Sequence, residues 1–264
     1  MYLKRKADAY LNAWKSDPNR SPLIIKGPRQ VGKTETIDYF AAHNYRSVVE
    51  INFVEEPKYR AITADGYGAN TIVRNISLID PAKKFIPGDT LIFFDEIQAH
   101  PDIATALKFF KIDGKYDVIC SGSMLGISYK QIESNSVGYK TDYEMRSLDF
   151  EEFLWARGYD EAVIESMFTH LCDATPFSEV EMNVFSTAFM DYCVLGGMPA
   201  VVASHIRTGT FEGTLQLQRQ LILDYQEDIR KYAQGLDQAR ILNVFNHIPV
   251  QLAKENKKFQ ISKV

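Results

Sequence analysis

The chain has 264 residues, of which 45% are hydrophobic and 24% charged, as in an ordinary globular protein of one large or two modest domains. The formal net charge of -4 gives no overall basic field, so bulk charge provides no argument for binding nucleic acid or an anionic membrane. The three cysteines are too few for a disulfide framework or a cysteine-rich zinc site, and no segment has the roughly 18 uninterrupted apolar residues of a membrane span. We therefore expect a cytoplasmic protein that does not contact membranes.

The first 53 residues predict helix, strand, helix and strand in turn. Apolar side chains recur at helical spacing along residues 2–15, at Leu3, Ala7, Tyr10, Leu11 and Trp14. After a break at Asp17–Pro22, the apolar run Pro22–Lys26 predicts a buried strand. Glu35–Ala42 is typical of a helix, and the β-branched and aromatic residues of Tyr45–Phe53 predict a second strand.

The turn between the first strand and the second helix fits G-x-x-x-x-G-K-[ST], the Walker A or P-loop pattern, at every specified position. It consists of Gly27, Pro28, Arg29, Gln30, Val31, Gly32, Lys33 and Thr34. Successive backbone N–H groups and the positive end of the helix dipole converge at such a turn and make an anion site. We expect Lys33 to reach the β- and γ-phosphates of a nucleotide and Thr34 to hold Mg²⁺. A chance glycine-rich turn is the alternative for an isolated match.

Thr90–Phe94 is the strongest strand, a continuous apolar run typical of a parallel strand covered on both faces. It ends at Asp95 and Glu96, as a Walker B strand does. Asp95 is placed to bind Mg²⁺ through its water shell, and Glu96 to act as the base or the residue that positions the attacking water. Taken alone, an apolar run that ends in acids is more often a strand meeting a solvated loop. Downstream of a complete P-loop, the functional interpretation is favoured.

Asp102–Lys111 predicts a helix, and Tyr116–Cys120 predicts a strand that runs into Ser121 and Ser123. Strands that alternate with helices imply a parallel, doubly wound α/β sheet, in which ligands bind at the carboxyl ends of the strands. The P-loop, Asp95 and the two serines all fall at such ends. We expect Ser121 and Ser123 to sense the γ-phosphate or orient water; an ordinary Ser-Gly turn is an equal alternative.

The sequence pattern changes beyond residue 128. Gly138–Met145 reads as a short hairpin or loop, and a mostly helical region opens at Phe150, with Glu151 and Glu152 typical of acids at a helix start. Further helices are predicted near 160–171, 179–195, 211–233 and 237–255. We expect an α/β P-loop domain over residues 1–155, with its N-terminal helix, and a smaller, lid-like helical domain over residues 156–264.

Phosphoryl transfer gains from a cation at the transition state, yet no arginine stands out in the motifs. Arg146 and Arg157 are near in sequence, but each is more typical of a surface or interface arginine paired with carboxylates. We therefore expect a homo-oligomer or a protein partner to supply the arginine. The five histidines show no metal-ligand spacing. The lysines of Lys254–Lys263 are more typical of a solvated helix end than of a nucleic-acid contact.

Together these motifs make the chain similar to a family of bacterial and archaeal AAA-type (AAA+ superfamily) ATPases that pair an N-terminal P-loop domain with a C-terminal domain of unknown function. The resemblance is carried by Leu23–Thr34, Leu91–Gln98, Ser121–Ser123, Ser147–Leu154 and Leu195–Pro199. Family members usually have Gly-Arg where this chain has Gly138-Tyr139, which puts an arginine role there in doubt. They also usually run further, whereas Ile261–Val264 resembles the threshold of a winged-helix-like segment, so we expect a fragment or a truncated relative.

The resemblance implies that the chain binds ATP and Mg²⁺ and hydrolyses ATP slowly, coupling nucleotide state to a conformational change or to assembly. The alternative is a nucleotide-gated DNA-binding or protein-scaffolding module with little hydrolysis. A kinase acting on a small molecule is a third possibility, but no acceptor pocket is readable in the helical region.

Overall fold

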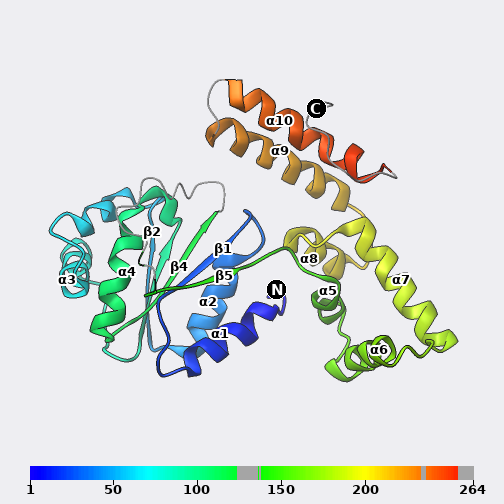
Figure 1. Cartoon of the computed structure of the whole chain (residues 1–264), viewed down its shortest axis with the longest axis horizontal. Helices are drawn as coiled ribbons and strands as arrows, with labels where there is room; N and C mark the ends of the chain where they lie inside the picture. Colours follow the sequence, from blue (N-terminus) through cyan, green and yellow to red (C-terminus); the bar gives the residue numbers. More distant parts are fainter. Residues whose placement is uncertain (124–135, 137, 233–235, 255–264) are drawn as a thin grey trace. The chain divides into compact units, whose positions relative to one another are not determined.

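The computed structural model describes residues 1–123, 136, 138–232 and 236–254 (Figure 1). It divides into two compact units, Met1–Thr210 and Phe211–Val264. The strands of the first unit are β1 (Leu23–Gly27), β2 (Ser47–Asn52), β3 (Thr90–Asp95), β4 (Asp117–Ser123) and β5 (Thr141–Glu144). The helices that accompany them are α1 (Lys6–Ser16), α2 (Lys33–Asn44), α3 (Ala69–Ile79) and α4 (Asp102–Asp113), with the 3-10 turns η1 (Pro57–Thr63) and η2 (Ile97–Ala99).

Within the described residues, the strands form one sheet in the order β2-β3-β4-β1-β5, and every neighbouring pair is parallel. Strand β4 therefore lies between β1 and β3. The register pairs Gly27 with Ser123 and Asn52 with Asp95. The carboxyl ends of the strands thus meet at one edge, as the sequence predicts.

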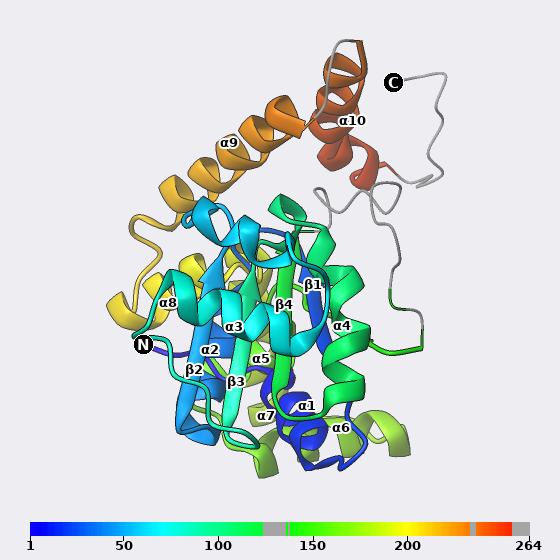
Figure 2. The same ribbon diagram turned by 90° about the vertical axis from the view of Figure 1, so that its left-hand side faces the viewer.

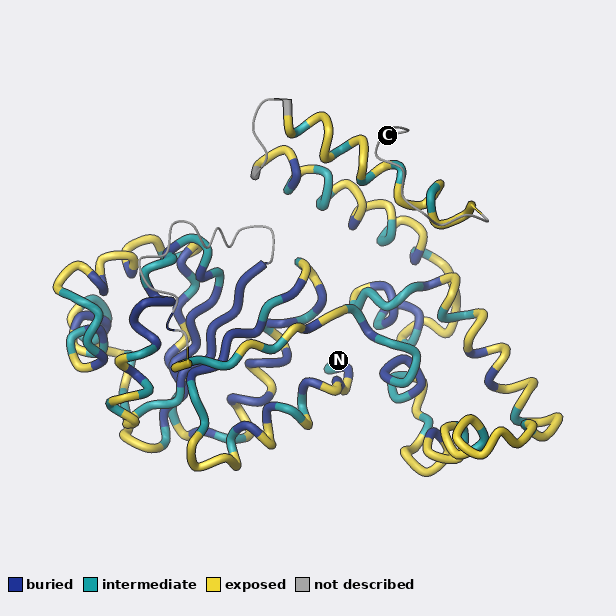
Figure 3. The backbone as a smooth tube through the Cα atoms, in the orientation of Figure 1, coloured by how far each residue is buried: buried dark blue, intermediate teal, exposed yellow. Residues whose placement is uncertain are grey.

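Helices cover both faces of this sheet (Figure 2). Alternate residues of β3 point to opposite faces: Leu91 and Phe93 pack in the core with α1 and α2, whereas Ile92 and Phe94 pack in the core with α3 and α4. All residues of β3 are buried, and Figure 3 shows the same for much of the sheet. The predicted α/β sheet flanked by helices, with a helical part after it, is confirmed.

Two elements differ from the sequence-based expectation. Thr141–Glu144 is not part of a hairpin or loop: it forms β5, which extends the sheet by pairing in parallel with β1. Its side chains alternate between half-buried and exposed, so it lacks the apolar run that identifies a central strand. The structure also contains α8 (Pro199–Thr208), for which we predicted no separate helix.

The remainder of the first unit consists of α5 (Phe150–Ala156), α6 (Glu161–Asp173), α7 (Glu179–Leu195) and α8. Leu154, Ile164, Phe185 and Ala188 form a small core between α5, α6 and α7, although most of α6 and α7 is exposed (Figure 3). The expected domain boundary between residues 155 and 156 falls inside the first compact unit, at the end of α5, and it stays a prediction.

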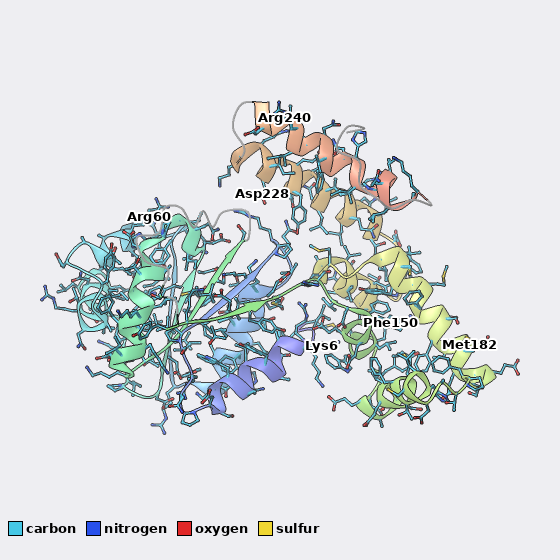
Figure 4. All side chains as sticks on the ribbon, in the orientation of Figure 1. Lys6, Arg60, Phe150, Met182, Asp228 and Arg240 are labelled. Atoms are coloured by element: carbon cyan, nitrogen blue, oxygen red, sulfur yellow. The ribbon has the colours of Figure 1, made fainter. Side chains whose placement is uncertain are left out.

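Helix α5 is tied to the α/β core at its first turn. The Lys6 ammonium, at the start of α1, pairs with Asp149 at 2.5 Å and with Glu151 at 2.7 Å. Figure 4 labels Lys6 and the neighbouring Phe150, which begins α5. Asp149 also caps α5, because its carboxylate accepts a hydrogen bond from the Glu152 N–H at 3.0 Å.

The linker from β5 to α5 contacts the turn between α7 and α8 through its backbone. The N–H of Leu148 donates to the carbonyl of Gly197 at 2.7 Å, and the Tyr192 hydroxyl donates to the Leu148 carbonyl at 2.8 Å. A Cβ atom at Gly197 would lie 2.0 Å from the Leu148 oxygen. Only glycine fits at this crossing.

The second unit contains α9 (Thr214–Tyr232) and α10 (Leu236–Leu252), which pack against each other. Tyr225 stacks on Phe245, and Gln226 donates to Asn246 at 3.0 Å. Most of Lys254–Lys263 and all of Ile261–Val264 lie outside the described residues. In the part of the chain that is described, no helix is long and apolar enough to cross a membrane.

Candidate nucleotide site

The P-loop follows β1 directly and ends in the first turn of α2. Gly32 adopts φ 89°, which favours glycine, and Gln30 is also left-handed at φ 62°. Gly27 is required for another reason: a Cβ there would lie 2.1 Å from the Met145 carbonyl oxygen, just past β5. The first motif glycine therefore permits the close approach of a neighbouring strand end, and the second permits the turn itself. Pro28, Arg29 and Val31 complete the loop.

Lys33 is the first residue of α2, and its side chain is 8% exposed. Its ammonium donates to the carbonyl oxygens of Gly27 at 3.0 Å and Pro28 at 2.7 Å, so it lies inside the curl of the loop. Burial lowers the pKa of Lys33 from its usual value, although the nearby Glu96 and Asp95 carboxylates partly oppose this shift. An anion bound in the loop would favour the charged form further.

Asp95 is the point at which the predicted site residues meet. Its side chain is buried, at 4% exposure, and accepts hydrogen bonds from the Thr34 hydroxyl at 3.2 Å and from the Ser121 hydroxyl. Strand order explains this meeting, because β4 with Ser121 lies between β3 and the P-loop strand. The structure thus brings together three positions that are far apart in sequence.

Two further residues join this site without having been predicted. The Asn52 amide, at the end of β2, donates to Asp95 at 3.3 Å, and the Gln98 amide donates to the Glu96 carboxylate. Asn52 could have been found by the rule that located the serines, since it ends a strand at the same edge of the sheet. Gln98 offers no comparable signal, because it does not end a strand but lies in the 3-10 turn η2 that follows β3.

Glu96 leaves the strand in a left-handed conformation, with φ 54° and ψ 46°. This region is uncommon for residues other than glycine and is often found at functional sites. The Glu96 N–H donates to Asp95 at 2.9 Å, which holds the turn closed. The side chain of Glu96 is half-buried, so its carboxylate is not sealed in the core.

Ser123 ends β4 opposite Gly27 and is 3% exposed. Its hydroxyl is buried without a hydrogen-bond partner among the described residues, as is the side-chain oxygen of Gln98. Unpaired buried polar atoms are rare and call for an explanation such as an unseen ligand. Ser123 lies on β4, which pairs with the P-loop strand β1, and Gln98 lies in η2, shortly after Asp95.

The two candidate arginines lie on the chain that leads away from this edge. Arg146 pairs with Glu144 at 3.0 Å and Arg157 pairs with Asp191 at 2.6 Å. Both therefore pair with carboxylates, as predicted. Across the described residues, no group of three or more His, Cys, Asp or Glu side chains could hold a metal ion.

Residues 19–154, more than half of the chain, match a protein family whose model is described as an AAA domain. The chain belongs to this AAA domain family. Residues 186–264 match a second family, described as a domain of unknown function. The AAA-type domain followed by a domain of unknown function confirms the resemblance that the motifs predict. Family membership supports a nucleotide-binding role of the ATPase type.

Solved structures also show similarity to this AAA chain. PCH-2 from C. elegans is similar with a TM-score of 0.37 and 11% identity, over 66% of this chain and 48% of that chain. The AAA chain thus spans about half the length of that structure. No curated protein matches the chain at a significant level.

Proposed function

We propose that this AAA protein binds ATP with Mg²⁺ and hydrolyses it, and that nucleotide state is coupled to a conformational change or to assembly. One observation carries the proposal: the buried carboxylate of Asp95 accepts hydrogen bonds from Thr34, at the end of the P-loop, and from Ser121 on the neighbouring strand. A strand end, a phosphate-binding turn and a helix N-terminus thus converge on one small polar volume.

The phosphate groups would bind to Lys33 and to the backbone N–H groups of the loop. The Lys33 ammonium already lies inside the loop, where two carbonyl oxygens are its partners. Phosphate oxygens carry full negative charge and make stronger hydrogen bonds to an ammonium than neutral carbonyls do. Lys33 would therefore turn from the loop carbonyls to the phosphates.

Mg²⁺ fits the residues present. Thr34 supplies a hydroxyl oxygen and Asp95 a carboxylate, which are the hard oxygen ligands that this ion prefers, and it usually keeps several waters. When bound, Mg²⁺ neutralises negative charge on the phosphates.

Glu96 would act as the base or as the residue that positions the attacking water. Its turn is fixed by the hydrogen bond to Asp95, and its carboxylate accepts from Gln98. Ser121 and Ser123 would line the γ-phosphate side, and the unpartnered hydroxyl of Ser123 would gain a partner there. Since Arg146 and Arg157 pair with carboxylates, a second copy or a protein partner would supply an arginine.

Nucleotide binding and ATP turnover in three variants test this proposal. Lys33→Ala should weaken MgATP binding strongly, whereas Glu96→Gln should bind MgATP but release no phosphate. Lys58→Ala removes one positive charge from an exposed position and should behave as wild type. A wild-type chain with no affinity for nucleotide in the presence of Mg²⁺ would contradict the proposal.

Three further measurements separate the alternatives. Turnover per subunit that rises with protein concentration would show that a neighbour completes the site. Product analysis distinguishes an ATPase, which releases free phosphate, from a kinase, which phosphorylates an acceptor. Salt-sensitive retention on duplex DNA without turnover would favour the nucleotide-gated DNA-binding module instead.

A further inference from the structure

Arg5 is a buried arginine, 5% exposed, that reaches three separate segments of the first unit. One terminal nitrogen, Nη1, donates to the carbonyl of Val31 in the P-loop at 2.7 Å. The other, Nη2, donates to the carbonyl of Arg146 at 2.7 Å, and Nε donates to the Glu152 carboxylate at 3.1 Å. The guanidinium thus spans the P-loop, the linker after β5 and the start of α5.

Glu152 fixes the direction in which this guanidinium points. It is 5% exposed and also accepts from the backbone N–H groups of Lys6 at 2.7 Å and Asp149 at 3.1 Å. Because both carboxylate oxygens are held by backbone groups, Glu152 cannot swing away with its partner. Arg5 is therefore a rigid donor, and its Nη1 is aimed at the phosphate-binding loop.

The carbonyl that Arg5 holds belongs to the peptide group between Val31 and Gly32. This peptide is trans, so its N–H points opposite to its C=O and away from Arg5. The Gly32 N–H has no hydrogen-bond partner within the described residues. A peptide beside glycine rotates at little steric cost, so an anchor on the carbonyl is needed to fix the direction of the N–H.

We propose that Arg5 is a positioning residue of the phosphate site, which holds the Val31–Gly32 peptide so that the Gly32 N–H points at a bound phosphate. Arg5 touches neither the nucleotide nor the reacting atoms. Its charge-assisted hydrogen bond also polarises the peptide, which makes the Gly32 N–H a stronger donor. This inference rests on the proposed function, because it assumes that the loop binds phosphate.

The affinity test uses the full chain and three variants. Arg5→Met should raise the Kd for MgADP at least tenfold and the Kd for MgATP by a similar factor, since loop amides contact phosphates that both ligands share. Arg5→Lys keeps the charge but cannot span three acceptors, so an intermediate loss is expected. Lys4→Met is the matched control: it removes the positive charge next to Arg5 in sequence, whose ammonium is exposed and pairs with Glu161, so its Kd should change less than threefold.

A second readout separates positioning from general stability. With ¹³C-carbonyl valine and ¹⁵N-glycine labels, only Val31–Gly32 and Val137–Gly138 give one-bond correlations in NMR spectra. Saturating MgADP should shift the Gly32 amide proton downfield in wild type and Lys4→Met, but clearly less in Arg5→Lys. If Arg5→Met does not fold, Arg5→Lys carries both measurements.

The outcomes distinguish the two proposals. Wild-type chain that binds no nucleotide would overturn the proposed function. Wild-type chain that binds, with arginine variants within twofold of its Kd and an unchanged Gly32 shift, would overturn the role of Arg5 alone. A loss of affinity as large in Lys4→Met as in Arg5→Met would also contradict it, because the effect would then follow the loss of a positive charge and not the bond to Val31.

Discussion

The hydroxyl of Thr34 donates to Asp95 at 3.2 Å, although 61 residues separate the two in sequence. This bond joins the first turn of α2 to the end of β3, across the strand that lies between β1 and β3. The two oxygens therefore occupy one polar volume, and we expect them to act on the same ligand.

Replacing Asp95 with asparagine should abolish the Mg²⁺ dependence of ATP turnover and reduce turnover by roughly a hundredfold or more, since asparagine lacks the charge that attracts the cation. Turnover measured over a Mg²⁺ titration checks this. Asp89→Asn, at the opposite end of β3, is the control and should keep the wild-type titration. Equal Mg²⁺ dependence of turnover in Asp95→Asn and Asp89→Asn would show that Asp95 does not bind the metal ion.

Gly27→Ala should destabilise the protein by at least about 2 kcal/mol, because the new Cβ would meet the Met145 carbonyl oxygen at 2.1 Å. Urea unfolding measures the change. Gly68→Ala is the matched control: its φ is -63° and the nearest atom, on Thr71, is 3.6 Å from the added Cβ. We expect a cost of about 1 kcal/mol or less there. Similar losses of stability in both variants would show that the chain after β5 moves to make room for the added Cβ.

Stability should fall as the pH is lowered through the range near 6.5, because of His100. Burial lowers the pKa of His100 below its usual value of 6.5. As the pH falls, His100 is therefore protonated in the unfolded chain before it is protonated in the folded one. Its contribution to the free energy of unfolding is complete above the pKa of the unfolded chain and is lost as the pH falls toward the lower pKa of the folded chain. Urea midpoints for wild type and His100→Gln measure this effect. The urea midpoint should depend less steeply on pH in His100→Gln than in wild type. His43→Gln, which changes an exposed histidine, should keep the wild-type dependence.

Nucleotide affinity should decline in alkaline solution, because burial lowers the pKa of Lys33 and only the charged ammonium binds phosphate well. Binding raises this pKa again, so MgADP should be bound with proton uptake. Calorimetry in buffers of different ionisation enthalpy detects that proton. Lys58→Ala should show the same uptake as wild type, and a wild-type enthalpy independent of the buffer at alkaline pH would refute the prediction.

The central strands, and the edge of the sheet where the P-loop and Asp95 lie, could be predicted from sequence. Both require particular residue types at particular positions. A strand buried on both faces must be continuously apolar, as β3 is, and a phosphate-binding turn needs glycine and lysine at fixed positions. From these two facts follow the parallel sheet and the grouping of Thr34, Asp95 and Ser121. Family membership agrees with this interpretation.

The misses have equally physical causes. The edge strand β5 is short and half-exposed, so its pattern resembles a loop. Arg5 lies in the basic run Lys4–Lys6, and such a run is ordinarily interpreted as exposed surface charge. Its sequence neighbours do not indicate that its guanidinium donates to three separate acceptors. Glu152 likewise looks like any acid at a helix start. Long-range polar pairs become visible only once the chain is folded.

The backbone crossing of Leu148 and Gly197 closes a loop of roughly fifty residues, which begins and ends at one point on the core. Helices α6 and α7 make up most of this excursion. Because its two ends meet at this backbone contact, the part of the loop beyond α5 can change in length without displacing the strands. The crossing therefore keeps α5, whose Glu152 holds Arg5, next to the core whatever the lengths of α6 and α7.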